Sequence, residues 1–241
     1  MLRGLYTSAA GMVAQEVRLD VVANNLANAV TPGYRADVAV TAALPSLFLY
    51  RLNDAIASFP GGPAGAPAPV GFLGTGAAVA EVFTLERPGP YRETGNPHDF
   101  ALRGPGYFVV QTPQGLCYTR NGAFLVNQDG DLTTADGYPV LTRDGQVARA
   151  DDPNLAANLA VVNPPAGTAL TKVGDNLFSS PQALPPAATE VVRGVLEAAN
   201  VAPVEAMVEL ISAMRAYEAG QKAIQTQDQT LDKLLNEVAK V

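Results

Sequence analysis

The sequence predicts an α+β fold in which a β-rich central domain lies between two terminal helices that pair with each other. Apolar residues near the N-terminus recur at steps of three and four, and those near the C-terminus recur at every seventh position. The middle of the chain holds short apolar runs separated by Asn-Gly and Asp-Gly pairs. With 241 residues, of which 48% are hydrophobic, the chain is long enough to bury a core in one or two domains.

The N-terminal helix is predicted over residues 3–28. Its apolar residues form one narrow face, interrupted by Glu16, and such a face is typical of a coiled coil. The members of this face are Leu5, Ala9, Met12, Leu19, Ala23 and Leu26. At about 1.5 Å per residue, this helix would be a rod roughly 40 Å long.

The predicted helix ends in an unusual stretch, VVANNLANAVTPGYR (residues 21–35), which contains three asparagines followed by a turn. Asparagine is a poor helix former because its amide competes for backbone hydrogen bonds. Asn24 and Asn28 lie four residues apart on one helical face, where buried amides would fix the register of a partner helix. A helix cap that faces water explains the same residues equally well. Pro32 and Gly33 suit the centre of a type II turn.

The middle of the chain is expected to contain a linker and then strands. Residues 59–76 form a Pro/Gly/Ala tract that is incompatible with a helix or a central strand, so we expect residues 37–76 to be an extended linker. Residues 77–193 are expected to form the β-rich domain. Within it, YFVVQT (107–112) and the segment 117–141 hold the apolar runs and turn pairs of hairpins.

The C-terminal helix is predicted to begin near Pro203, which suits a first helical turn, with Glu205 near its positive end. Large apolar residues at every seventh position favour supercoiling against another helix over simple packing on the middle domain. These residues are Leu210, Tyr217, Ile224, Leu231 and Val238, with Met207, Met214 and Leu235 at the companion position, where Gln221 and Asp228 are polar. The expected helical domain joins residues 1–36 with residues 194–241.

Candidate sites for chemistry are weak. Asn127, Asp129 and Asp131 alternate as in a calcium loop, but the glycine comes one place early and the final glutamate is missing, so a hairpin turn is favoured. The single cysteine, Cys117, suits an apolar filler in a strand, and the single histidine, His98, suits a loop. No two carboxylates are recognisable as an acid/base pair. We therefore expect no enzymatic activity, no cofactor, no metal and no small-molecule substrate.

Charge and hydropathy exclude further classes. The formal net charge of −7 argues against a nucleic-acid-binding protein, which would carry a basic patch. No stretch approaches the roughly 20 apolar residues of a membrane span. Glu16, Arg18 and Asp20 interrupt the N-terminal segment, so no cleavable signal peptide is recognisable. The chain is expected to stay in the cytosol or to be exported by a route that reads no such signal.

Three separated blocks carry recognisable motifs: ANNLANAVTPGYR (23–35), TGNPHDFALRGPGYFVVQTPQG with the following YTRNGAFLVNQDGDLTTADGYPVL, and the segment 194–235. The first resembles a signature shared by bacterial flagellar rod and hook proteins. The second resembles the central block, and the third the C-terminal helix, of flagellar basal-body rod proteins of proximal and distal type. The stretch after Val140 is compressed, and His98 and Phe100 stand where members more often have aliphatic residues.

The resemblance implies a structural subunit that assembles helically into the flagellar rod, the drive shaft that links the motor to the hook. It implies that the terminal helices form an inner tube layer, ordered on assembly, with the β-rich part outside. It also implies contacts with other rod and hook proteins, export through the flagellar export apparatus, and a place in the basal body within the periplasm and cell wall. The alternatives are a hook or hook-associated protein and, more remotely, a peptidoglycan-acting enzyme; the central block favours the rod.

The resemblance further implies that the asparagines pack between subunits rather than face water. The expected assembly interface therefore combines the asparagines and their turn with the apolar faces of both helices. Its residues are Leu5, Met12, Leu19, Asn24, Asn25, Leu26, Asn28, Pro32, Gly33, Tyr34, Met207, Leu210, Met214, Tyr217, Ile224, Leu231 and Leu235.

Overall fold

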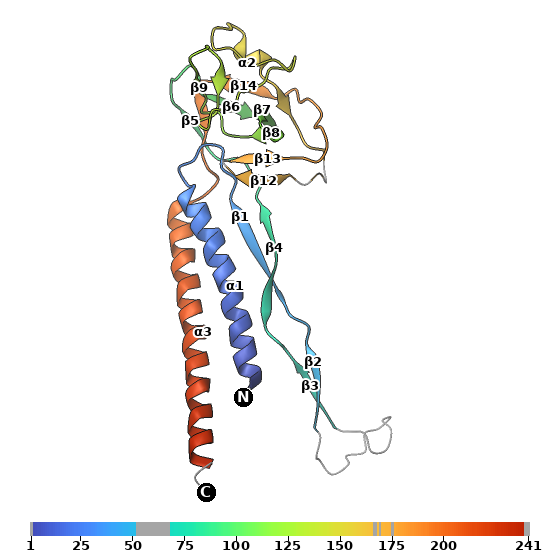
Figure 1. Cartoon of the computed structure of the whole chain (residues 1–241), viewed down its shortest axis with the longest axis vertical. Coiled ribbons are helices and arrows are strands. Elements are labelled where there is room, and N and C mark those ends of the chain that lie inside the picture. The colour runs from blue at the N-terminus through green and yellow to red at the C-terminus, as the bar shows by residue number, and fades with distance from the viewer. Residues whose placement is uncertain (1, 52–67, 166–167, 169, 175, 239–241) are drawn as a thin grey trace. The chain divides into compact units, whose positions relative to one another are not determined.

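The computed structural model describes residues 2–51, 68–165, 168, 170–174 and 176–238. It confirms the α+β class, with a long helix near each end of the chain and strands between them (Figure 1). These helices are α1 (Leu2–Ala27) and α3 (Pro203–Val238), close to the expected extents. Within the part of the chain described, none of the helices combines the length and apolarity that a membrane span requires.

Contacts between residues divide the chain into two compact units. The helix–ribbon unit contains Met1–Asn24, Asp37–Phe83 and Val204–Val241, and the β unit contains Asn25–Ala36 and Thr84–Pro203. This division differs from the one expected from composition. The turn after α1 belongs with the β-rich part because it is hydrogen-bonded there, and much of the expected linker forms paired strands.

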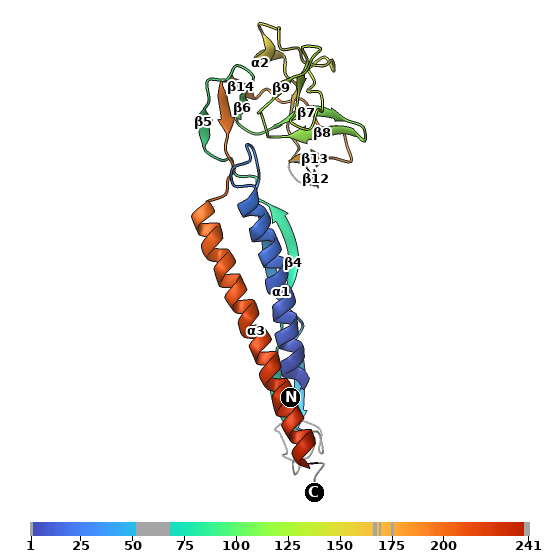
Figure 2. The ribbon, with the colours of Figure 1, turned by 60° about the vertical axis from the view of Figure 1, so that its left-hand side comes forward.

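In the helix–ribbon unit, α1 and α3 lie side by side and run in opposite directions (Figures 1 and 2). Glycine permits their close approach, since a Cβ atom on Gly220 would lie 2.7 Å from Cγ of Met12. Farther along the pair, Arg18 forms an ion pair of 2.6 Å with Glu209, both about half exposed. An exposed pair of this kind contributes at most about 1 kcal/mol, so apolar packing holds the helices together.

Four strands form the ribbon of the same unit. β1 (Asp37–Ala43) pairs with β4 (Ala77–Thr84), and β2 (Leu47–Arg51) pairs in antiparallel fashion with β3 (Ala68–Leu73). The linker expected over residues 37–76 is therefore largely replaced by strands, apart from the stretch outside the described residues. Among the described residues β3 pairs with β2 alone, which agrees with the expectation that the Pro/Gly/Ala tract forms no central strand.

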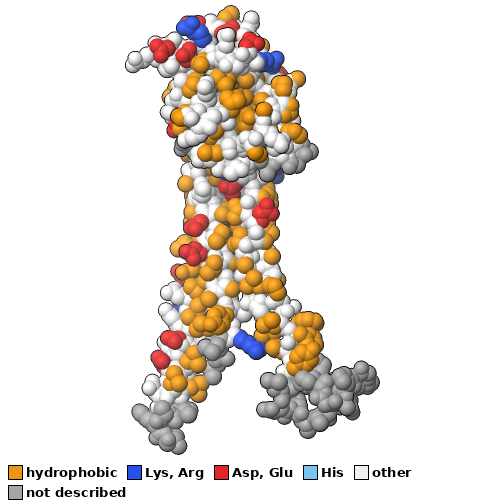
Figure 3. All heavy atoms as spheres, turned by 45° about the vertical axis from the view of Figure 1, so that its right-hand side comes forward, with side chains coloured by type: hydrophobic (Ala, Val, Ile, Leu, Met, Phe, Trp, Pro, Cys, Tyr) orange, Lys and Arg blue, Asp and Glu red, His pale blue; other side chains and the backbone are white. Residues whose placement is uncertain are grey.

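An aromatic cluster lies on β2 and β3. The ring of Phe48 lies 4.9 Å from the ring of Tyr50 and 4.8 Å from the ring of Phe72, measured between centroids. All three side chains are exposed, and apolar atoms gather on this part of the ribbon beside the grey residues in Figure 3. Such a patch is typical of a surface that contacts another molecule.

The β unit is built around one larger sheet. Its elements are β5 (Tyr91–Glu93), β6 (Phe100–Arg103), β7 (Tyr107–Thr112), β8 (Gly115–Thr119), β9 (Leu125–Val126), β10 (Leu132–Thr133), α2 (Leu155–Asn158), β11 (Val161–Val162), β12 (Thr171–Gly174), β13 (Leu177–Ser179), β14 (Glu190–Arg193) and β15 (Val195–Glu197). The sheet has the antiparallel order β11-β7-β8-β13-β12. The strand β7 coincides with the expected YFVVQT strand. The pairs β5–β15, β6–β14 and β9–β10 surround the sheet.

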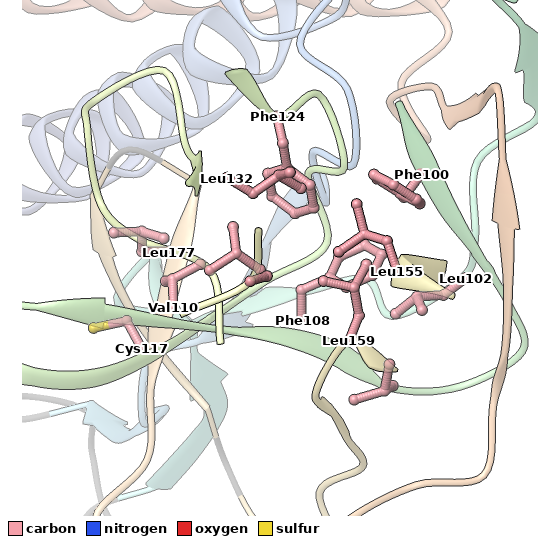
Figure 4. Close-up of a cluster of buried hydrophobic side chains, with 13 residues drawn as sticks. Phe100, Leu102, Phe108, Val110, Cys117, Phe124, Leu132, Leu155, Leu159 and Leu177 are labelled. Carbon is pink, nitrogen blue, oxygen red and sulfur yellow. The ribbon is translucent and has the colours of Figure 1, made fainter. Parts of the chain in front are cut away.

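The hydrophobic core of the β unit gathers around Phe108 on β7 (Figure 4). The centroid of the Phe124 ring lies 5.3 Å from that of Phe108 and 6.1 Å from that of Phe100. The buried members are Phe100, Leu102, Phe108, Val110, Cys117, Phe124, Leu132, Val140, Ala148, Leu155, Leu159, Val161 and Leu177. Cys117 is thus the apolar filler that the sequence predicts.

The hairpin turn expected in place of a calcium loop is also confirmed. Oδ1 of Asn127 accepts the backbone N–H groups of Asp129 at 2.9 Å and Asp131 at 2.8 Å. The strands β9 and β10 pair on either side of this turn. The asparagine side chain therefore serves the backbone of the turn, as is common at such positions.

Candidate functional site

The turn that follows α1 is bound tightly within the β unit. The backbone N–H of Gly33 donates to the carbonyl of Glu197 at 2.7 Å. Gly33 has a φ of +67°, in the left-handed region that favours glycine. A Cβ atom at this position would overlap the carbonyl carbon and oxygen of Arg120. Glycine is therefore required both for the backbone conformation and for the space.

Glu197 holds two arginines in a buried ion cluster. Its Oε1 lies 2.6 Å from Nη1 of Arg35, and its Oε2 lies 2.7 Å from Nε of Arg120. The side chains of Glu197, Arg35 and Arg120 are only 1%, 4% and 3% exposed. Oε1 also accepts the backbone N–H of Gly89 at 3.1 Å. Both carboxylate oxygens are thus satisfied, which buried charges require.

Arg120 is also bound to the backbone of the neighbouring turn. Its terminal nitrogens donate to the carbonyl groups of Leu102, Gly104 and Gly106, which lie at the end of β6 and just before β7. The guanidinium group has five N–H donors in one plane and can serve several acceptors at once. Arg120 therefore ties the β6–β7 turn to Glu197 and, through Glu197, to Arg35.

Asn200 joins three segments of the β unit that are far apart in the sequence. Its Oδ1 accepts the N–H of Ala36 at 2.7 Å, and its Nδ2 donates to the carbonyls of Leu85 at 3.0 Å and Arg87 at 2.9 Å. The N–H of Leu85 in turn donates to the carbonyl of Ala36 at 2.8 Å. The chain leaves the β unit for the ribbon after Ala36, returns near Leu85 and leaves again for α3 after Asn200. Hydrogen bonds therefore join these three points. We call this arrangement the Asn200 junction.

Asn25 and Tyr34 pack within the β unit. The hydroxyl of Tyr34 donates to Oδ1 of Asn25 at 3.1 Å, and both side chains are buried. The ammonium of Lys172 lies 4.7 Å from the centroid of the Tyr34 ring and donates to the carbonyl of Arg35 at 2.7 Å. Two residues expected at the interface between subunits are therefore engaged by their own chain.

The other asparagines take different positions. Asn24 is exposed, and Asn28 is half-buried with its Oδ1 accepting the Thr31 hydroxyl at 3.2 Å. The Asn28 carbonyl also accepts the N–H of Thr31 at 3.1 Å, so this residue helps to form the turn. Pro32 is half-buried and Gly33 is buried. That Asn24 and Asn28 also contact neighbouring subunits stays a prediction.

The repeat positions of α3 divide into half-buried and exposed sets. The half-buried set is Leu210, Tyr217, Ile224 and Leu231. The expected companions Met207, Met214 and Leu235 are 50%, 48% and 69% exposed, and their contact with neighbouring subunits stays a prediction. The small residues Ala206 and Ala213, each one place before Met207 and Met214, are buried. The two alanines share the seven-residue spacing, but small residues give a weaker hydrophobic signal than the large apolar residues of the repeat.

Exposed apolar residues form a continuous face on the first turns of α3. They are spaced at three and four residues, so they share one side of the helix. This outer face of α3 consists of Val204, Met207, Val208, Ile211 and Met214, each between 48% and 75% exposed.

On α1, the expected interface residues are half-buried. They are Leu5, Met12, Leu19 and Leu26. Ala14 and Val22 are buried, whereas Tyr6 and Val13 are 70% and 60% exposed. The helix therefore presents apolar groups to more than one side, as α3 does.

The buried ion cluster was not predicted. Each of the three motif blocks contains one member of the cluster: Arg35, Arg120 or Glu197. Nothing in the sequence around these residues indicates that they contact each other. The one available signal is local: Arg120 directly follows the strand run CYT, and Glu197 follows the run VL. A charged residue beside a buried strand suggests a buried ion pair, although its partner is still open.

Replacing Gly33 by alanine is expected to lower the free energy of unfolding by about 2 kcal/mol or more, because strain at positive φ adds to overlap with backbone atoms. Urea unfolding followed by circular dichroism measures this loss. Gly130→Ala is the matched control, since Gly130 has a φ of +83° but open space around it. Equal losses in the two variants would show that the contact with Arg120 is unimportant.

Family models of flagellar proteins match three parts of the chain. The model described as flagella basal body rod protein matches residues 5–35. The flagellar hook protein FlgE/F/G D1 domain matches residues 101–173, and the flagellar basal body rod FlgEFG protein C-terminal model matches residues 192–237. These segments contain most of α1 with its turn, most of the sheet of the β unit, and nearly all of α3.

Relatives match along almost the whole chain. The chain is 31% identical to the flagellar hook-basal body complex protein FlhO of Bacillus subtilis, with 100% of both chains covered. It is 35% identical to the flagellar basal-body rod protein FlgG of Agrobacterium fabrum, covering 95% of this chain and 96% of the relative. It is 33% identical to the flagellar basal-body rod protein FlgF of Caulobacter vibrioides, covering 92% of each. The chain therefore belongs to the flagellar basal-body rod protein family and is a structural subunit of the rod.

Proposed function

We propose that the subunit assembles helically with copies of itself and with other rod and hook proteins, forming the drive shaft between motor and hook. The observation that carries this proposal is the outer face of α3, where five large apolar side chains are exposed. Monomeric proteins rarely leave a continuous apolar face uncovered. When a surface meets a different surface on the next copy and the rotation does not close, an open helical filament results.

The half-buried repeat of α3 supports a coiled-coil contribution to this assembly. Leu210, Tyr217, Ile224 and Leu231 keep part of their surface accessible in the single chain. In the rod, a helix from a neighbouring subunit covers the remaining surface, so that helix pairs form a tube layer. A seven-residue repeat gives every subunit the same contact.

We also propose that the role is structural and not catalytic, which the names of the relatives as rod and hook-basal body proteins support. The subunit reaches the basal body, in the zone of the periplasm and cell wall, through the flagellar export apparatus. It requires no nucleic acid and no small-molecule substrate for this role.

Replacing Met214 by aspartate is expected to abolish assembly and leave the subunit folded. Met214 is 48% exposed, so water solvates the new charge in the free subunit. In the rod the same charge would be buried without a partner at every contact, at a cost of about 3 kcal/mol or more. Sedimentation of purified assemblies and swimming of cells that produce the variant measure the effect, and thermal unfolding checks the fold.

The matched control is Ala216→Asp. Ala216 is exposed on the same helix but lies outside the outer face, so this variant is expected to assemble normally. Wild-type assembly by the Met214→Asp variant would mean that the outer face of α3 is solvated in the rod.

A further inference from the structure

Two of the four methionines of the chain lie on the outer face of α3. Met207 and Met214 are 50% and 48% exposed, so water and small solutes reach their side chains in the single subunit. They are seven residues apart, which is about two helical turns, and therefore project from the same side of the helix. A thioether sulfur in this position is open to an oxidant from solution.

Among the described residues, the other sulfur atoms are less accessible. Met12 is half-buried where α1 and α3 approach, since a Cβ atom on Gly220 would lie 2.7 Å from its Cγ and 3.5 Å from its Sδ. Cys117, the only cysteine of the chain, is 5% exposed in the core of the β unit. A thiol buried in apolar surroundings is inert because it does not readily form the reactive thiolate. Accessible sulfur in the described part of the chain is therefore concentrated on the outer face of α3.

We propose that Met207 and Met214 are a modification site for hydrogen peroxide, and that their oxidation prevents the subunit from assembling. A lone pair of the thioether sulfur attacks one peroxide oxygen, and the O–O bond breaks. The transferred oxygen stays on sulfur as a sulfoxide, while its proton passes to the departing hydroxide, which leaves as water. The sulfur loses two electrons and the peroxide gains them.

The sulfoxide changes the outer face of α3 from apolar to polar. Water solvates its oxygen in the free subunit, so the fold is expected to be unchanged. The other side chains of this face, Val204, Val208 and Ile211, are aliphatic and donate no hydrogen bond. Burying the new acceptor among such groups is costly. This effect on assembly rests on the proposed function, which covers the outer face in the rod.

The first experiment measures where peroxide reacts. The full-length chain is treated with hydrogen peroxide at a protein concentration too low for assembly, and digestion followed by mass spectrometry gives the oxidation rate of each methionine. Met207 and Met214 are expected to react several-fold faster than Met12. Equal rates, or faster oxidation of Met12, would overturn the site. Loss of the helical signal in circular dichroism would also contradict the proposal, which requires a folded subunit.

The second experiment compares the protein concentration at which assemblies sediment with and without peroxide treatment. In the wild type, treatment is expected to raise this concentration about tenfold or more. The double variant Met207→Leu, Met214→Leu has no sulfur on the outer face but keeps it apolar, so its ratio is expected to be close to one. Met12→Leu is the control and is expected to keep the wild-type ratio. Because each ratio is measured within one protein, any effect of the substitution itself cancels.

Reduction of the sulfoxides is expected to restore assembly. Methionine sulfoxide reductases specific for the two sulfoxide epimers, supplied with dithiothreitol, convert two thiols into a disulfide and release the sulfoxide oxygen as water. If the two methionines are oxidised selectively but the wild-type ratio stays at one, or if the double variant keeps the wild-type ratio, their oxidation does not control assembly and the proposal is wrong. If the untreated wild-type chain forms no assemblies at all, the proposed function fails, and the oxidation rates alone then decide whether the modification site exists.

Discussion

Replacing Glu197 by alanine is expected to lower the free energy of unfolding by about 3–5 kcal/mol, a large part of the stability of a typical domain. The change leaves Arg35 and Arg120 buried without a counter-ion. It also removes the acceptor of the Gly89 N–H group. Chemical unfolding followed by circular dichroism measures the loss, and the β unit is expected to show it most clearly.

The control for this change is Arg103→Ala. Nη1 of Arg103 lies 3.6 Å from Oε2 of Glu190, and both side chains are more than 60% exposed. Such an exposed ion pair contributes little, so this variant is expected to unfold almost as the wild type does. Glu197→Gln keeps the shape of the side chain and removes only the charge. A wild-type unfolding curve for Glu197→Ala would mean that water, not Glu197, solvates the two guanidinium groups.

Replacing Ala213 by aspartate is expected to separate α3 from its packing in the helix–ribbon unit. Ala213 is only 2% exposed and lies seven residues before Gly220, where α3 closely approaches α1. The new carboxylate would be larger than the space and would be buried without a partner, which costs several kcal/mol, of the order of 3 kcal/mol or more. The helical signal is expected to fall at a lower temperature than in the wild type, and assembly to be lost.

Comparison with two neighbours makes this test specific. Ala216→Asp adds the same charge at an exposed position and is expected to change neither stability nor assembly. Met214→Asp is expected to lose assembly alone. If Ala213→Asp melts as the wild type does, the small residues of α3 do not hold the helix pair together.

The helices and hairpins could be predicted because their periodicity is local. Steps of three and four mark α1, seven-residue steps mark α3, and turn residues such as Asn127 mark the hairpins. The buried residues Ala206 and Ala213 of α3 were not expected from the sequence, because they are small and carry little hydrophobic signal. Two helices that pack closely favour small residues at their contact. A search for large apolar residues therefore passes over the positions at which the helices come closest.

The ribbon and the buried ion cluster could not be predicted for a different reason. The linker was expected over residues 37–76 because of the Pro/Gly/Ala tract that contains β3, whereas β4 lies in the segment that was expected to be β-rich. Arg120 and Glu197 are 77 residues apart in the sequence and meet only through the folded arrangement of the β unit. A single sequence shows that an arginine and a glutamate are present, but it does not show that their side chains lie close together in the fold.

The Asn200 junction makes the ribbon and α3 independent of each other in length. Because the chain leaves, returns and leaves again at tied points, residues can be added to or removed from either element without changing the hydrogen bonds of Ala36, Leu85 and Arg87. Hydrogen bonds within the β unit therefore fix these points of the chain, whatever the length of the segments between them.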